Sequence, residues 1–304
     1  MSPDRGETVV APRLVSTLQE GGNHGGGNQL FVYDVAGNRR VLKVYRRRGG
    51  AFGEVIKSIS HRVFERKLGV TAGSRCETER RTLQLWNDAG FDVPEFYEDP
   101  VPAGTRGEPC LWLEYCPGPS VADVFEDPDV PFDRRRELMV RVAETMGRRH
   151  RLAIERDDPL LIPEHASIKH VIVFGDRLVQ IDFENGYGDG FDVIEAACQE
   201  LSGTLRSVAR KAEPEFEALV DAFVEAYRHP EQLARIALYG LSGGGTYRGF
   251  KRWQDGKRRA RFSKTTMFWC TLDRLRTVPG MEDEIARALE ECSDDRDRGA
   301  PNGA

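Results

Sequence analysis

Two charged residues of this sequence, a lysine and a glutamate, stand among apolar neighbours, and the lysine could bind a phosphate. Lys43 lies in the run Val41–Tyr45, where alternate residues of a strand share a face, so it points the same way as the first and last residues of that run. Glu79 falls in line with Trp86 along one stripe of a helix expected over residues 75–89. An unpaired buried carboxylate is costly, so Glu79 needs a partner, and Lys43 is the candidate. The alternative for Lys43 is an edge-strand lysine that reaches solvent.

A second acidic group follows an apolar strand expected over residues 178–181. Asp182 ends this run, and Glu184 comes two residues later, facing the same way if the strand geometry persists. Carboxylate oxygens before a glycine-rich stretch (185–190) suit a Mg²⁺ ion that carries a nucleotide. The alternative is a polar cap between a strand and a loop.

These residues need a sheet and helices to position them. Strands are expected first, because β-branched and aromatic residues alternate in the N-terminal part, and a glycine cluster (21–27) separates two of them. The expected strands are 14–18, 29–35, 41–45 and 111–115, with a hairpin turn at Gly37-Asn38. Helices dominate later: 133–154 is amphipathic, a hairpin turns about Gly175-Asp176, and the pattern is helical from residue 193.

Strands followed by helices predict an α+β chain with two lobes. The predicted division is an N-lobe over residues 1–116, a C-lobe over 117–292 and a disordered tail over 293–304. The 304 residues have an ordinary globular composition, with 39% hydrophobic and 31% charged residues. A net charge of −5 argues against a uniformly basic nucleic-acid-binding protein.

Several compositional features point to a soluble chain in a reducing compartment. No apolar run approaches the ~20 residues of a membrane span, and the N-terminus lacks the apolar core of a secretory signal. The six cysteines are scattered and form no CxxC pair, so a zinc site or a disulfide framework is not expected. We expect a cytoplasmic protein, with peripheral contact to the membrane surface as a further option.

Taken in order, these motifs resemble the protein-kinase-like superfamily over residues 14–230. The resemblance implies a nucleotide site in which the glycine cluster, with Gly25 and Gly26, covers the phosphates, Lys43 holds the α- and β-phosphates, and Glu79 orients Lys43. It further implies a hinge at Glu114 and Cys116 whose backbone bonds adenine. Ile181-Asp-Phe-Glu184 matches the metal-binding Asp-Phe-Gly with Glu in place of Gly, and Asp192 is similar to the acid that braces the catalytic loop.

The subgroup that the chain most resembles is the lipopolysaccharide-core (Kdo/heptose) sugar kinases, with the RIO-like kinases as more distant relatives. The basic stretch after the lysine strand (45–50), the long insertion before the Glu79 helix and the run 89–94 carry this resemblance. It implies an ATP-dependent phosphotransferase acting on a hydroxyl acceptor. That acceptor would be a core sugar on an anionic glycolipid at the inner membrane surface, or a protein Ser/Thr.

The catalytic loop departs from the superfamily. His170, twelve residues before Asp182, matches the second metal-binding position, but the expected aspartate five residues earlier is His165. Three interpretations remain. In the first, His165 accepts the hydroxyl proton, since a histidine titrates near pKa ~6.5. In the second, Glu164 serves as the base from one residue out of register, and in the third the chain is a pseudokinase that binds nucleotide without transferring phosphate. The alternative for His170 is a loop histidine bonded to backbone.

The implied cofactors are ATP with Mg²⁺ or Mn²⁺. Imidazole is a poor ligand for Mg²⁺ and a better one for Mn²⁺, so a ligating His170 predicts a preference for Mn²⁺. The basic patch at 251–264, with a local charge of +6, could contact anionic lipid, a phosphorylated sugar or nucleic acid, or form a solvated helix face. Nucleic acid is the least favoured partner.

Overall fold

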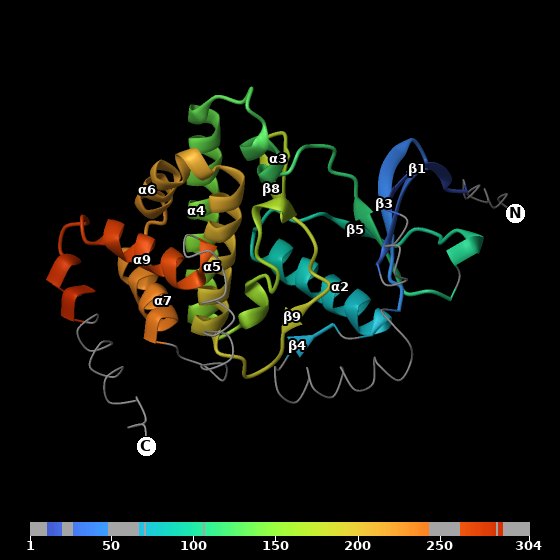
Figure 1. Cartoon of the computed structure of the whole chain (residues 1–304). Helices are drawn as coiled ribbons and strands as arrows, with labels where there is room; N and C mark the ends of the chain where they lie inside the picture. Colours follow the sequence, from blue (N-terminus) through green and yellow to red (C-terminus); the bar gives the residue numbers. More distant parts are fainter. Residues whose placement is uncertain are drawn as a thin grey trace, which may run out of the picture. The chain divides into compact units, whose positions relative to one another are not determined.

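The computed structural model describes residues 11–19, 27–47, 67–69, 71–105, 107–242, 262–283 and 285–287. The chain divides into two compact units (Figure 1). Unit 1 comprises residues 1–117 together with Phe183–Asn185, and unit 2 comprises residues 118–182 and 186–304. The short stretch 183–185 therefore packs with the β-rich unit, although the sequence analysis grouped it with the helical one.

Unit 1 is built on a five-stranded antiparallel sheet with the order β1-β2-β3-β6-β5. The strands are β1 (Arg13–Gln19), β2 (Gln29–Val35), β3 (Asn38–Val44), β5 (Phe96–Tyr97) and β6 (Cys110–Glu114), with the short β4 at Lys67–Leu68 and a 3-10 turn η1 at Ala103–Thr105. A core of Val35, Leu42, Val44 and Trp112 forms on the sheet. The four strands predicted in this region are all present.

The hairpin between β2 and β3 turns one residue earlier than predicted. Ala36 and Gly37 occupy the turn with φ of 52° and 84°, and Asn38 already begins β3. Two successive positive φ values are typical of the tight turn that matches the twist of a hairpin. Asp34 stabilises it, because its side chain accepts the backbone N–H of Gly37 at 2.9 Å.

Helix α2 (Ala72–Asp88) crosses unit 1 and begins three residues before the predicted start. Thr71 and Ser74 form a reciprocal capping box, in which each side chain accepts the other's backbone N–H. The helix ends as predicted before Gly90, whose φ of 74° suits glycine.

Unit 2 is mainly helical. Its helices are α3 (Val121–Glu126), α4 (Phe132–Arg156), α5 (Val193–Lys211), α6 (Phe216–Ala226), α7 (Pro230–Ser242) and α9 (Lys264–Leu275). Its strands are β7 (Val171–Phe174), β8 (Arg177–Gln180) and β9 (Gly186–Tyr187), and its 3-10 turns are η2 (Pro159–Leu161), η3 (Ile168–His170) and η4 (Glu213–Glu215). Helices α4, α5 and α6 pack against one another.

The predicted α+β architecture, a small β-rich unit and a larger mainly helical one, is confirmed. Within the described ranges, no helix is long and apolar enough to cross a bilayer. The tail 293–304 and most of the basic patch, 251–261, lie outside the described residues.

Candidate functional site

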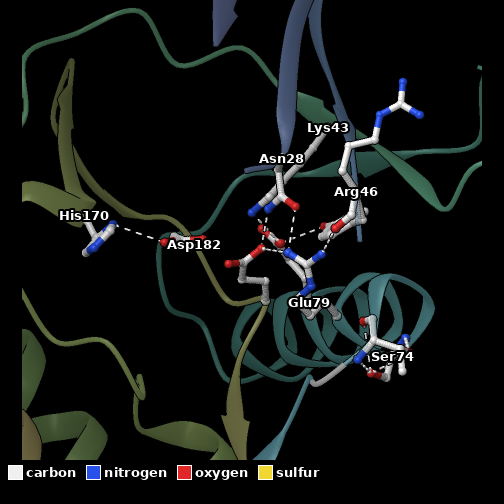
Figure 2. A network of polar contacts seen from close by, with 11 residues as sticks. Asn28, Lys43, Arg46, Ser74, Glu79, His170 and Asp182 are labelled. Carbon is white, nitrogen blue, oxygen red and sulfur yellow. Dashed lines mark hydrogen bonds and ion pairs between the residues drawn. The ribbon is translucent and has the colours of Figure 1, made fainter. Parts of the chain in front are cut away.

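The pair predicted between Lys43 and Glu79 is present. Lys43 lies in β3, between β2 and β6, and α2 brings Glu79 to it (Figure 2). The Nζ of Lys43 donates to the Oε2 of Glu79 at 2.7 Å, and the two side chains are only 7% and 2% exposed. Desolvating two charges costs about as much as their attraction returns, so a buried pair is weak evidence for stability alone.

Tyr45 contributes to the same pair, as the shared strand face predicted. Its hydroxyl donates to the Oε2 of Glu79 at 2.6 Å, so one carboxylate oxygen accepts from both Lys43 and Tyr45. Burial, and then the negative charge of Glu79, raise the pKa of Tyr45 well above its ordinary value. The phenol therefore stays protonated and remains a donor at neutral pH.

A second buried ion pair, which the sequence analysis missed, lies one turn earlier on α2. Arg75 is fully buried and donates through Nη1 to the Oε2 of Glu184 at 3.2 Å and to the Oδ1 of Asn28 at 2.8 Å. Asn28 in turn donates its amide to the Oε2 of Glu184, and the Nη2 of Arg75 donates to the carbonyl of Arg46. Residues 75, 79, 83 and 86 share one helix stripe, so the spacing of Arg75 was the available signal.

The predicted strand geometry does not continue through Glu184. Strand β8 ends at Gln180, and Asp182 has a φ of 72°, so the alternation of side chains is broken there. Phe183 is buried with its ring 4.7 Å from that of Trp86, in an edge-on arrangement. A Cβ on Gly69 would lie 2.1 Å from the carbonyl oxygen of Glu184, so only glycine fits there. The carboxylate of Glu184 contacts Asn28 and Arg75.

In unit 2, the predicted metal ligands His170 and Asp182 are neighbours. The Nδ1 of His170 lies 3.6 Å from the Oδ2 of Asp182 (Figure 2). The backbone sets this distance, because the N–H of Ile181 donates to the carbonyl of His170 at 2.9 Å, next to the β7–β8 hairpin. The carbonyl that accepts this bond belongs to the backbone of His170, so it does not test the alternative of an imidazole bonded to backbone. No group of three or more His, Cys, Asp or Glu side chains in the described ranges is arranged to hold a metal ion.

The two candidates for the base also lie together. The Nδ1 of His165 is 2.6 Å from the Oε2 of Glu164, and the side chains are 55% and 6% exposed respectively. The chain around them is fixed, since Ser167 Oγ bonds Ser207 Oγ at 2.9 Å and Gly203 packs against the backbone of Ala166. The exposed member is therefore the imidazole, and the carboxylate lies behind it.

The predicted hinge lies at the end of β6. The backbone N–H of Glu114 donates to the carbonyl of Glu95 at 2.7 Å, and Glu114 pairs with Arg40 across the sheet. Cys116 follows β6, and its thiol lies 4.0 Å from the carbonyl of Glu114. Gly25 and Gly26, predicted to cover the phosphates, lie outside the described residues.

Asp192 differs from its predicted role of bracing the catalytic loop. Its side chain caps α5, accepting the backbone N–H groups of Ile194 and Glu195 at 2.7 and 3.1 Å, and it also accepts the hydroxyl of Tyr239. Among the described residues, then, this carboxylate serves the N-terminus of its own helix.

A solved structure described as WaaP in complex with acyl carrier protein is similar to this chain. The match covers 75% of this chain and 86% of that chain, at 15% sequence identity and a TM-score of 0.43. No protein-family model and no curated protein matches the sequence. At this identity the likeness concerns the fold alone.

Proposed function

We propose that this protein is an ATP-dependent phosphotransferase that moves the γ-phosphate of ATP to a hydroxyl acceptor. The observation that carries the proposal is the buried pair of Lys43 and Glu79, joined at 2.7 Å between a central strand and a helix. A solvent-exposed lysine would need no such partner. An acid that fixes a strand lysine is what the kinase-like resemblance requires for holding the α- and β-phosphates.

The hinge residues and the metal-binding residues have separate roles in this proposal. The carbonyl of Glu114 and the N–H of Cys116 would bond the adenine edge. Asp182 and His170 would hold the divalent cation, which supplies neutralisation of phosphate charge when bound. One carboxylate and one imidazole at 3.6 Å fit such an ion, because Mg²⁺-type sites use few protein ligands and complete their shell with phosphates and water. The imidazole favours Mn²⁺ over Mg²⁺.

The acceptor hydroxyl would lose its proton to His165. The Oε2 of Glu164 lies 2.6 Å from Nδ1, so in this proposal the proton of the neutral imidazole is assigned to Nδ1 and the accepting role to Nε2. As the acceptor oxygen bonds the γ-phosphorus, the bond from that phosphorus to the β–γ bridging oxygen breaks and ADP leaves. Glu164 then stabilises the imidazolium, much as a buried carboxylate does in hydrolase triads.

A second candidate is a nucleotide-binding pseudokinase with a regulatory role. It is favoured by the histidine at position 165, where the resemblance expects a substrate-orienting aspartate. Phosphoryl transfer depends mainly on positioning and on charge stabilisation, so this change lowers activity without excluding it.

The proposal is tested by incubating the purified protein with radiolabelled ATP and either Mn²⁺ or Mg²⁺, and by measuring transfer of the label to an acceptor. The acceptors offered are a lipopolysaccharide-core glycolipid at the inner membrane surface and a Ser/Thr protein. Transfer is expected, faster with Mn²⁺, and Lys43→Met and Asp182→Asn should each reduce it about 100- to 1000-fold. ATP binding without transfer to any acceptor supports the pseudokinase, and full activity in both variants contradicts a kinase mechanism.

A further inference from the structure

We propose that Arg75 is a positioning residue of this phosphotransferase: together with Asn28 it holds Glu184, and so fixes the segment that follows Asp182. The inference rests on the proposed function, because that function makes Asp182 the metal ligand. It also assigns Glu184 the role of an anchor, where the sequence resemblance suggested a third metal ligand.

The first argument is that Arg75 connects several parts of unit 1. Its Nη1 reaches both Asn28 and Glu184, its Nη2 reaches the carbonyl of Arg46, and Asn28 bonds Glu184 directly. A planar guanidinium donates from separate nitrogens in a fixed fork and so reaches acceptors on different sides, whereas a lysine donates from a single nitrogen. Asn28 immediately precedes β2, so the set joins a strand, a helix and the stretch 183–185 within unit 1.

The second argument is that α2 carries two buried ion pairs four residues apart. Arg75 and Glu79 lie one above the other on the same stripe, and Glu79 bonds Lys43 while Arg75 bonds Glu184. A shift of α2 would strain both pairs at once. The positions of Lys43 and of residues 183–185, all within unit 1, therefore depend on one helix.

The third argument concerns the charge and packing of Glu184. The positive charge of Arg75 compensates that of the carboxylate, which reduces its attraction for a cation. The neighbouring Phe183 ring packs on Trp86, and the backbone carbonyl of Glu184 packs against Gly69. Residues 183–185 are thus held from several sides, and Asp182 is joined to them by a single peptide bond.

The test compares Arg75→Met, Arg75→Lys and Glu184→Gln in the full-length chain, with Arg80→Met as the matched control. Arg80 lies on the same helix, but its ion pair with Glu98 is long, at 3.7 Å, and largely exposed. For each protein, calorimetry measures the affinity for a non-hydrolysable ATP analogue with and without Mn²⁺, and thermal unfolding is followed in parallel. The decisive quantity is the ratio of the two affinities, which a loss of stability alone would leave unchanged.

Arg75→Met is expected to lower the Mn²⁺-dependent affinity about ten-fold, the range seen for groups that support a metal ligand. Arg75→Lys keeps the charge and the fold, so it remains measurable if the methionine variant does not fold. Its ammonium serves fewer acceptors, and its affinity should fall between those of wild type and Glu184→Gln. The control should bind as the wild type does.

Two results would overturn the inference, and they differ from failure of the proposed function. If Arg75→Lys and any folded Arg75→Met keep the wild-type ratio while Glu184→Gln loses it, Glu184 is a metal ligand and Arg75 does not position it. If no variant changes the ratio, the segment needs no anchor. If the wild-type protein binds no nucleotide, the proposed function itself fails, and the inference fails with it.

Discussion

Each unit contains a buried network of charged residues, yet the two networks differ in what they connect. In unit 1, Lys43 and Glu79 join the central strand β3 to α2. In unit 2, Arg149 and His150 of α4 both contact the carboxylate of Glu200 in α5. The side chains of both networks are almost fully buried, so burial of charge does not by itself separate a functional site from a structural one.

The unit 2 network connects helices. Taking Glu200 as ionised, Nε2 of His150 donates to it at 2.9 Å, and Nδ1 accepts the hydroxyl of Tyr227 at 2.7 Å. Gln232 donates to that same hydroxyl at 2.9 Å. These contacts favour a role in holding α4, α5 and the end of α6 together. The unit 1 network instead includes a lysine, the kind of residue that binds phosphate, together with the acid that fixes it, and this is the difference on which the proposed function depends.

Removing one cation from each network sharpens this comparison and should give the largest effects. Lys43→Met and Arg149→Met each leave a carboxylate buried without its cation, which costs about 3–5 kcal/mol of unfolding free energy. Only Lys43→Met should also abolish ATP binding in the protein that remains folded. Urea unfolding measures the first quantity, and calorimetry with an ATP analogue measures the second.

The paired variants Lys43→Met/Glu79→Leu and Arg149→Met/Glu200→Leu serve as controls. Removing both charges should restore most of the stability in each unit. Nucleotide binding should stay lost in the first pair and normal in the second. Loss of binding in both pairs would mean that the two networks act through overall stability alone.

The pair of Lys43 and Glu79 could be predicted because local periodicity revealed both members. Each interrupts an apolar pattern of known period, two for a strand and 3.6 for a helix. The partnership of Arg75 with Glu184 could not be predicted, since 109 residues separate them and no periodicity relates them. The same is true of His150 and Glu200, 50 residues apart. Single sequences reveal which charges are buried more readily than which charges meet.

Local backbone chemistry explains the smaller differences. The sequence analysis extended the alternation of a strand to Glu184, but the positive φ of Asp182 ends that alternation. This could not be predicted, because an aspartate does not by its residue type require a positive φ. The early start of α2 follows from a capping box at Thr71 and Ser74, a signal that was present but was not used. The strands and the α+β fold class could be predicted because they depend on patterns that are repeated over many residues.

Removing the tyrosine hydroxyls gives the second comparison, with intermediate effects. Tyr45→Phe removes a donor to Glu79 and leaves Lys43 in place, so the cost should be about 1–2 kcal/mol. Tyr227→Phe should cost more, because its hydroxyl both donates to His150 and accepts from Gln232. Thermal unfolding of the two variants ranks the costs. A larger cost for Tyr45→Phe would contradict this ranking, which assumes that the hydroxyl with two hydrogen bonds contributes more to stability.

The smallest effect is a dependence of stability on pH, which should belong to the network that contains His150. Burial lowers the pKa of His150 below its ordinary value, although Glu200 opposes the shift. Below pH ~6.5 the unfolded chain therefore binds a proton that the folded chain excludes, and stability is lost as the pH falls, by at most about 1.4 kcal/mol per pH unit for one group. Urea unfolding at pH 7.5, 6.5 and 5.5 (about one unit on either side of the ordinary pKa) measures the slope. His150→Gln removes the titrating group, so its slope should be shallower than that of the wild type. Equal slopes would contradict the prediction, because they would show that His150 does not contribute to the dependence of stability on pH.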